Sequence, residues 1–409
     1  MEMIFKLAWR NIWRNKRRTL ITIASIFFAI FLSLLMRSIQ KGTFSNIVNN
    51  VVHSYTGYIQ VHKMGYWDDK DINNSFEMTD SLVGSLKSNR NVREVIPRLE
   101  SFALASAGPK TKGVMVVGID PDKENILTGL KDKVISGRYL NEKDTGILVG
   151  KKLAEYLGIR TGDTLVLIGQ GYHGTSAAGK WRVAGIIHLP SPDLERQMVY
   201  LPINITQNFY EAGNHVTSLV LDLKNPDKAD RTVSELEKMN IPGDYEIMSW
   251  EMMMVELVQL VESKSASSTI MLGILYMIVG FGIYGTIVMM TLERTREMGI
   301  MMTVGMHKIK VRIMVLVESL LIGITGIAAG IAAALPIILW FYHHPFRLAG
   351  SMAETYESYG FESLVCFEPP SLYFLKNALV IIVLVLISTI YPIRRIGRLK
   401  PFEALHYKI

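Results

Sequence analysis

The sequence predicts a membrane protein with four transmembrane α-helices and one large extracytoplasmic α+β domain between the first two. Two observations lead to this fold class. The chain of 409 residues contains four apolar runs, and crossing a hydrocarbon core of roughly 30 Å takes about 20 helical residues. Positive charges also gather in three short segments beside these runs. Only 20% of the residues are charged, against about 25% in soluble proteins, as expected for a chain with several membrane helices.

The predicted spans are residues 19–41, 268–292, 313–342 and 372–392. A basic amphipathic segment, residues 1–18, precedes the first span. We expect this span to remain as an uncleaved anchor, because its apolar stretch exceeds the roughly 7–15 residues of a signal peptide and no Ala-x-Ala-like cleavage site follows it.

Two features inside the spans bear on helix packing. Small residues let membrane helices approach closely, and we expect this of the glycines in spans two and three, namely Gly273, Gly280, Gly282, Gly285, Gly326 and Gly330. Glu318 lies near the start of span three, where we expect it to reach water or Arg312 in a structural role.

The charge distribution predicts the orientation of the spans. Residues 1–19, the connection 293–312 and the tail 393–409 hold 16 basic and four acidic residues, a net charge of +12. The rest of the chain carries −5, which together gives the formal charge of +7. Short basic segments beside spans usually lie in the cytoplasm. The three segments are therefore predicted to be cytoplasmic, and nucleic acid is not needed to explain the basic pI.

The segment 42–267 and the shorter loop 343–371 are then expected outside the membrane. Alternation and short apolar runs predict strands at residues 57–62, 113–119, 147–149, 164–168, 182–187 and 197–201. Capping and stop signals predict helices at 80–88, 151–157, 229–239 and 250–263. The turn-rich block 136–221 is expected to form an inserted β-rich subdomain.

No pattern in the chain predicts an enzyme, a metal site or a bound cofactor. The single cysteine, Cys366, excludes an intrachain disulfide and a cysteine-rich metal site. His343 and His344 are adjacent and better explained as interfacial anchors than as zinc ligands. The loop 169–180 contains a match to the G-x-G-x-x-G dinucleotide motif and a near-match to the phosphate-binding P-loop. A strand-like run follows it, however, where both motifs require a helix. A flexible hairpin is predicted there instead.

The connection between spans two and three carries the functional interpretation. Residues 293–306 read ERTREMGIMMTVGM, a charged half that continues span two followed by a methionine-rich half. Methionine suits adaptable protein surfaces. Composition alone favours equally an amphipathic helix lying on the membrane and a docking helix for a cytosolic partner.

This segment resembles the E-R-x-R-E-[IVM]-G signature of the FtsX/MacB-like ABC transporter permeases. The lead-in LAWRNIWRNKRRT at residues 7–19, the tail KPFEAL at 400–405 and the order of spans are also similar to that family. The resemblance implies a coupling helix that seats in an ATPase subunit, with matching positions at Glu293, Arg294, Arg296, Glu297, Gly299 and Gly305. The chain departs from the pattern at Met302, where arginine is usual, and at Thr303 and Met306, where alanines are usual.

Within that family, GYIQVH at residues 57–62 resembles the G-H-[IV]-Q-[IV]-H strand of the lipoprotein-releasing LolC/LolE branch. The MacB branch has an ATPase domain fused ahead of its first span, whereas about 18 residues precede it here. The resemblance implies a Porter-like outer domain with an inserted Sabre-like part. The loop 169–180 lies roughly where LolC carries the hook for its periplasmic carrier, but its sequence is not hook-like.

The implied function is that of a non-catalytic permease subunit that couples ATP hydrolysis in another chain to lipoprotein release from the bacterial inner membrane. Its expected partners are a cytosolic ABC ATPase holding ATP and Mg²⁺, a second permease copy or paralogue, membrane lipid and a periplasmic lipoprotein carrier. Both termini are expected in the cytoplasm. An FtsX-like scaffold controlling periplasmic enzymes and MacB-like export of drugs or peptides are the alternatives.

Overall fold

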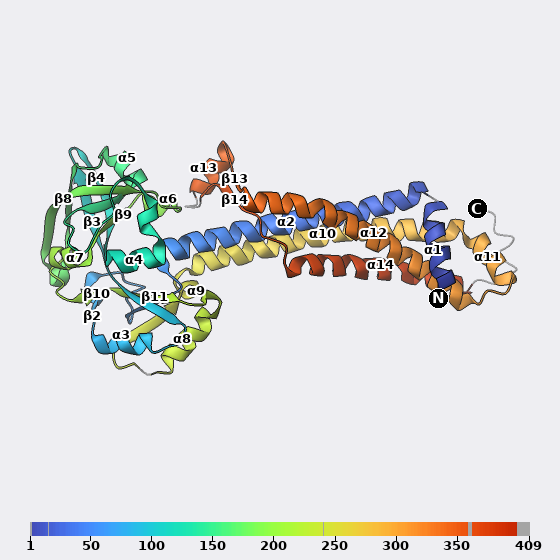
Figure 1. The fold of residues 1–409 in the computed structure, drawn as a ribbon, viewed down its shortest axis with the longest axis horizontal. Coiled ribbons are helices and arrows are strands. Elements are labelled where there is room, and N and C mark those ends of the chain that lie inside the picture. The colour runs from blue at the N-terminus through green and yellow to red at the C-terminus, as the bar shows by residue number, and fades with distance from the viewer. Residues whose placement is uncertain (1, 15, 240, 359–361, 399–409) are drawn as a thin grey trace. The chain divides into compact units, whose positions relative to one another are not determined.

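Four long apolar helices contain the four predicted spans. The computed structural model describes residues 2–14, 16–239, 241–358 and 362–398. Within these residues, four helices are long and apolar enough to cross a membrane. Each includes one predicted span and extends beyond it (Figure 1): α2 (Lys16–Val51), α10 (Val255–Glu293), α12 (Lys308–His343) and α14 (Leu372–Arg398). The predicted tail motif at 400–405 lies outside the described residues.

The chain divides into two compact units. The first comprises Met1–Phe44, Val261–Arg347 and Leu364–Ile409, and the second comprises Ser45–Leu260 and Leu348–Ser363. The first unit holds α1 (Glu2–Arg14), α11 (Thr295–Thr303) and most of the long helices. The second holds nearly all of the predicted outer domain together with α13 (Ser351–Ser358) from the later loop.

Glycines in α12 allow it to pack closely on α2. A Cβ atom at Gly326 would lie 2.6 Å from Ile26, and one at Gly330 would lie 2.9 Å from Ile30. Small residues are therefore required at these two positions. In α10 a Cβ atom at Gly280 would lie 3.5 Å from Leu384 on α14, whereas one at Gly273, Gly282 or Gly285 would meet nothing within 4 Å among the described residues.

One twisted sheet organises the second unit. Its strand order is β12-β1-β11-β3-β4-β9-β6-β8-β5, and β7 also pairs with β3 and β8. The strands are β1 (Ile59–Lys63), β3 (Val92–Ala107), β4 (Lys110–Ile119), β5 (Val134–Gly137), β6 (Ile147–Gly150), β7 (Thr164–Gln170), β8 (Ser176–Ile187), β9 (Met198–Pro202), β11 (Ser218–Leu223) and β12 (Tyr245–Ser249). Together with its helices this sheet confirms the predicted α+β class.

The predicted helices at 80–88, 151–157 and 229–239 are present, whereas those at 121–128, 192–195 and 203–209 were not predicted. The helices of this unit are short. They are α3 (Asp80–Lys87), α4 (Pro121–Thr128), α5 (Lys151–Leu157), α6 (Pro192–Glu195), α7 (Ile203–Phe209), α8 (Ala229–Glu237) and α9 (Trp250–Met253). The hydroxyl of Thr79 caps α3 by accepting a hydrogen bond from the Leu82 amide at 3.3 Å. The helix predicted over 250–263 is instead interrupted at Met254, where α9 ends and α10 begins at Val255.

The long strand β3 divides the sheet between two cores. Its first half pairs with β11, and its second half pairs with β4 and β7. The first core packs α3 and α8 against β1, β3 and β11, with Leu86, Leu219 and Val233 among its buried residues. The second core lies among β4, β6, β7 and β9, with Val116 and Val149 among its buried residues.

The inserted subdomain therefore has different ends from the predicted block 136–221. The strand β4, which starts at Lys110, pairs in parallel with β9 and belongs to the second core. The strand β11 pairs with β1 and β3 and belongs to the first core. The prediction missed β3, because this strand contains Pro97 and buries Arg98 and Glu100, residues that are uncommon inside strands.

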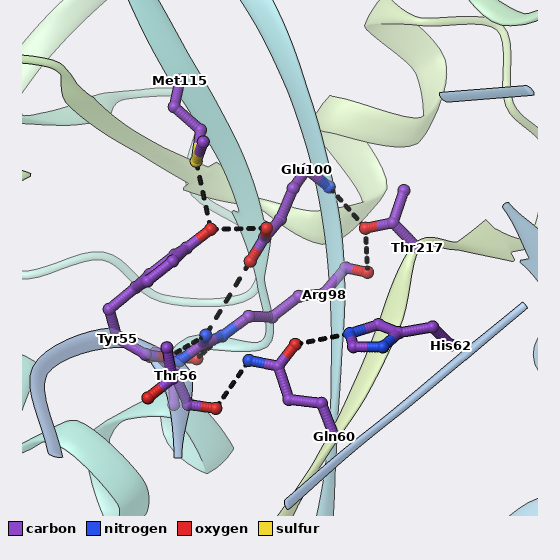
Figure 2. Close-up of polar contacts among 9 residues, drawn as sticks. Tyr55, Thr56, Gln60, His62, Arg98, Glu100, Met115 and Thr217 are labelled. Atoms are coloured by element: carbon purple, nitrogen blue, oxygen red, sulfur yellow. Dashed lines mark hydrogen bonds and ion pairs between the residues drawn. The ribbon is translucent and has the colours of Figure 1, made fainter. Parts of the chain in front are cut away.

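A buried polar network joins β3 to the segment that follows α2. Arg98 is 1% exposed and donates hydrogen bonds from Nε and Nη2 to the carboxylate of Glu124 at 2.9 and 2.7 Å. The hydroxyl of Tyr55 donates to Glu100 at 2.6 Å and also contacts the Met115 sulfur (Figure 2). The Arg98 guanidinium also donates to the backbone carbonyl of Tyr55. A buried charge needs such partners, so the network fixes the π-helical turn Val52–Thr56 against the sheet.

His62 on β1 is buried in its neutral form. Its Nε2 lies 2.7 Å from the amide oxygen of Gln60, and its ring packs against Tyr66 and Trp67. Burial, with a smaller effect from Lys70, lowers the pKa of His62 from 6.5 to about 3. The unfolded chain therefore binds a proton more readily than the native domain between these two pH values.

We predict that the second unit loses stability as the pH falls from 6.5 towards 3, because His62 takes up a proton only on unfolding. Its contribution is fully present above pH 6.5 and decreases by about 1.4 kcal/mol per pH unit below it. Thermal unfolding of the purified protein between pH 7 and pH 4 measures this slope. The variant His62→Gln is expected to flatten it, and His344→Gln, at an exposed histidine, to leave it unchanged. Equal slopes in wild type and His62→Gln would contradict the assignment.

Candidate functional site

The connection after α10 is a helix break followed by a short helix. The helix α10 ends at Glu293, and Arg294 adopts φ −97° and ψ 8° before α11 begins at Thr295. The predicted charged helix that continues span two is therefore wrong at this point, since the chain changes direction at Arg294. Gly305 follows α11 with φ +102°, a conformation that favours glycine and ends the helix. The next helix, α12, already begins at Lys308.

A buried ion pair fixes this break. The Arg294 side chain is 10% exposed, and its Nη1 lies 2.6 and 2.7 Å from the two carboxylate oxygens of Glu318 on α12. Glu318 thus pairs with Arg294 and not with the expected Arg312. The pair adjoins a cavity of about 20 Å³, which is large enough for one water molecule. Charges placed here need a partner, so the position of Arg294 depends on α12.

Two further ion pairs tie the N-terminal helices to the same connection. Arg14 on α1 binds Glu297 on α11, and Arg18 on α2 binds Glu293 at the end of α10. Arg294 also reaches Glu297, with 3.3 Å between Nε and the carboxylate. Burial alone would raise the pKa of Glu297, but the hydrogen bonds and charges of the two arginines lower it below its usual value. The carboxylate therefore remains ionised between them.

The helix α11 has an inner and an outer face. Met298 and Met302 are 1% and 8% exposed and pack with residues of α12 and α14, namely Val311, Met314, Val315 and Ile396. The outer face presents Ile300, which is 46% exposed, and the helix is followed by Val304, which is 83% exposed. The methionine-rich half thus serves internal packing on one side and leaves an apolar edge on the other.

The six predicted site residues occupy different environments. Arg296 and Gly305 are exposed, Arg294 and Gly299 are buried, and Glu293 and Glu297 are half-buried in ion pairs. The structure brings Glu293, Arg294 and Glu297 into one network with residues that the sequence interpretation did not group with them: Arg14, Arg18 and Glu318.

The sequence interpretation also missed the exposed edge of α11 at Ile300 and Val304, although the spacing of the residues indicates it. Arg296, Ile300 and Val304 recur at intervals of four, while Met298 and Met302 recur at the same interval on the other side. This spacing distinguishes two faces of a helix. By contrast, no local pattern relates Arg14 to Glu297, which is 283 positions away.

The loop predicted as a flexible hairpin is a short, tightly bonded turn. The strands β7 and β8 pair as far as Gln170 and Ser176, so most of the segment 169–180 is strand. The amide of Tyr172 donates to the carbonyl of Tyr210 and the amide of His173 to the side chain of Asn73, both at 2.7 Å. The predicted strand after the loop is confirmed, and the loop is fixed to the domain.

Metal-ligating side chains do not assemble in the part of the chain that the structure describes, where no group of three His, Cys, Asp or Glu residues is placed to hold an ion. His344 instead stacks on Trp340, with 4.7 Å between ring centroids.

Two family models together match most of the chain. The MacB-like periplasmic core domain matches residues 19–239, more than half of the sequence, and the FtsX-like permease C-terminal region matches residues 269–401. A large domain after the first span and a three-span region behind it define an ABC transporter permease. The chain belongs to the FtsX/MacB-like family of these permeases, and it is a multi-pass protein of the bacterial inner membrane. The predicted family is confirmed.

Several curated proteins are similar over most of this chain. The lipoprotein-releasing system transmembrane protein LolC of Xylella fastidiosa is 24% identical over 334 residues, covering 76% of this chain and 77% of that protein. LolC of Neisseria meningitidis is 21% identical over 410 residues, covering 95% and 94%. The macrolide export ATP-binding/permease protein MacB 2 of Aeromonas hydrophila is 20% identical, covering 88% of this chain and 56% of that protein.

Among solved structures, the periplasmic region of MacB from Actinobacillus actinomycetemcomitans aligns with 53% of this chain and 98% of that structure. The sequence identity is 16% and the TM-score is 0.36.

We predict that breaking the Arg294–Glu318 pair from one side destabilises the first unit more than removing both charges. Glu318→Gln leaves a buried guanidinium without its counter-charge, which costs about 3–5 kcal/mol. The double variant Arg294→Met with Glu318→Met leaves no buried charge and should recover most of this loss. Thermal unfolding of the protein in nanodiscs measures the difference.

The matched control for this cycle is Arg296→Met, which removes an exposed arginine two positions away and should change the unfolding temperature little. A double variant as unstable as the sum of both single variants would contradict the pairing.

Proposed function

We propose that this chain is a non-catalytic permease subunit whose short helix α11 receives force from a separate cytosolic ABC ATPase. ATP and Mg²⁺ would be bound by that ATPase and not by this chain. The observation that carries the proposal is the form of α11. It offers an exposed edge at Ile300 and Val304, while its other side is fixed by ion pairs and buried methionines. A force that a partner applies to this edge would therefore displace α11 together with the helices to which it is bound.

The ion pairs supply a physical route for the force. Displacement of α11 moves Glu297 and therefore Arg14 on α1, and it moves Arg294 and therefore Glu318 on α12. Glu293 at the end of α10 forms an ion pair with Arg18 at the start of α2, so these two helix ends would move together. Both α10 and α2 are single helices, of 39 and 36 residues, so the motor step is proposed to act along them on the outer domain.

The charge distribution supports the orientation that this mechanism needs. The basic segments at residues 1–19, 293–312 and 393–409 carry a net charge of +12, and such segments favour the cytoplasmic side. We therefore place α1, α11 and both termini in the cytoplasm and the large domain in the periplasm.

A second permease subunit, identical or related, is proposed to cover α10. This helix exposes large apolar side chains, among them Met277 at 61% and Phe281 at 70%. A Cβ atom at Gly273, Gly282 or Gly285 would meet nothing within 4 Å in the part of the chain that the structure describes, so these glycines would allow close approach of another helix.

We propose that the cargo is a lipoprotein, released from the outer leaflet of the inner membrane to a periplasmic carrier. The support is the set of relatives named as LolC and LolE, which align over about three quarters or more of this chain. The bonded turn at residues 171–175 does not supply a free hook for such a carrier, so carrier contact is expected elsewhere on the domain.

Docking on the outer edge of α11 predicts that Val304→Glu and Ile300→Glu weaken association with the ATPase that co-purifies with the wild-type chain. A desolvated, unpaired carboxylate at this contact should reduce binding roughly 100-fold, because about 2–3 kcal/mol would be lost. Pull-down and ATPase stimulation in nanodiscs measure both effects. The control is Ile135→Glu, at a 54% exposed isoleucine of the other unit. Unchanged association would refute the docking role.

Depletion of the protein is predicted to retain outer-membrane lipoproteins in the inner membrane. Membrane fractionation with immunoblotting of several lipoproteins measures their distribution, and a plasmid copy of the wild-type gene should restore it. Chaining of cells with correctly sorted lipoproteins would instead favour a scaffold that controls periplasmic enzymes. Antibiotic sensitivity with correct sorting would favour export of drugs or peptides.

A further inference from the structure

The second unit contains a cavity of about 880 Å³ that no part of the proposed mechanism uses. One wall is formed by Val51, the last residue of α2, and Tyr55, which follows it by four positions. Another is formed by Met254 and Leu260, at the start of α10. The remaining lining includes Met115 on β4. Its volume falls within the range of about 300–1,000 Å³ typical of ligand pockets.

The lining is predominantly apolar and unusually rich in methionine. Five of the 18 lining residues are methionines, whereas the whole chain has 22 in 409 residues. They are Met115, Met248, Met252, Met253 and Met254. Because methionine is flexible and polarizable, such walls adapt to ligands of irregular shape. This composition favours a flexible apolar ligand over a rigid polar one.

The charged residues of the lining do not form an anion site. Lys70 is the single cation among them, and its ammonium lies 3.7 Å from the centroid of the Trp67 ring. The acids Asp68, Asp193 and Glu256 are exposed to solvent. With three acids against one occupied cation, a ligand anchored by a phosphate or carboxylate is disfavoured. The apolar walls are therefore the part of the cavity that would recognise a ligand.

Part of the wall is held in place without a ligand. The Tyr55 hydroxyl donates to Glu100 at 2.6 Å and lies 3.1 Å from the Met115 sulfur (Figure 2). Glu100 in turn lies 3.8 Å from Arg98, and its amide donates to Thr217 at 2.9 Å. This network keeps the side of the cavity next to Tyr55 preformed, which reduces the entropy lost on binding.

We propose that this cavity binds a fatty acyl chain of the lipidated cargo after the chain has left the membrane. The proposal rests on the proposed lipoprotein release. An acyl chain in water exposes apolar surface at a large free-energy cost, and the Met-rich cavity removes that surface from water. In sequence, its walls adjoin the ends of two membrane helices. Val51 is the last residue of α2, ten positions after the predicted span 19–41, and Val255 is the first residue of α10.

The test uses the full-length protein in nanodiscs with its co-purified ATPase and an uncharged palmitoyl methyl ester that carries a photoreactive diazirine on its acyl chain. After irradiation, mass spectrometry locates the adducts. We expect them on peptides containing Tyr55, Met115 and residues 248–260. The variant Met254→Trp fills the cavity at a half-buried position and should lower adduct yield there roughly tenfold, equivalent to about 1.4 kcal/mol of binding free energy.

Two further variants separate loss of the site from loss of the fold. Met248→Gln keeps the approximate length of the side chain but makes it polar, and it should also lower the yield. Met64→Trp, at a 59% exposed methionine outside the cavity, should leave it unchanged. Protease resistance and circular dichroism of each variant verify that the domain is folded. Equal adduct yields in wild type, Met254→Trp and Met248→Gln would overturn the site.

Failure of the site and failure of the proposed function give different results. Absence of cavity adducts from a protein whose depletion mislocalises lipoproteins would overturn the acyl site and leave the function standing. Cavity adducts in a protein whose depletion leaves lipoproteins correctly sorted would overturn the assignment to lipoprotein cargo. Cavity adducts together with slower lipoprotein release by Met254→Trp would support both.

Discussion

The pairing of Arg294 with Glu318 is the constraint on which the cytoplasmic end of this permease depends. A carboxylate inside a membrane helix is costly unless a partner neutralises it, and Arg294 does so from the break between α10 and α11. The break cannot move away from α12 without exposing both charges to apolar surroundings. The pair thereby fixes the start of α11, the helix on which Met298 is buried and Ile300 is exposed.

The second unit also contains a buried arginine–glutamate ion pair, here inside a sheet domain. Arg98 and Glu124, both about 1% exposed, form a bidentate pair inside the sheet domain. Burying two charges is rarely the most stable choice, but a buried pair accepts few alternative geometries. Here it specifies how the turn after α2 meets β3, because Arg98 also binds the backbone of Tyr55. Each unit therefore has a buried arginine where a long helix meets its neighbours.

Much of the fold was predictable because it depends on local patterns. Apolar length identified the four spans. The cap at Thr79 located the helix predicted at 80–88, and Gly158, a glycine directly after the helix predicted at 151–157, located the end of that helix. What failed depends on tertiary partners. The strand β3 was missed because it contains a proline, Pro97, and two buried charged residues. The burial of these charges is explained only by their tertiary contacts with Glu124 and Tyr55. The site was predicted as a segment, but its network was not, because no local spacing connects α1 with α11.

The strand β3 has a consequence for how this domain can be recombined with its relatives. Its first half belongs to one core and its second half to the other, so neither core has a free edge along it. A chimera cut at the turn-rich boundaries 136 and 221 would divide partners of β4 and β11. An exchange between family members therefore has to transfer β3 and β4 together with the inserted part. The segment that can be exchanged as a unit includes β3 and the strands paired with it on both sides.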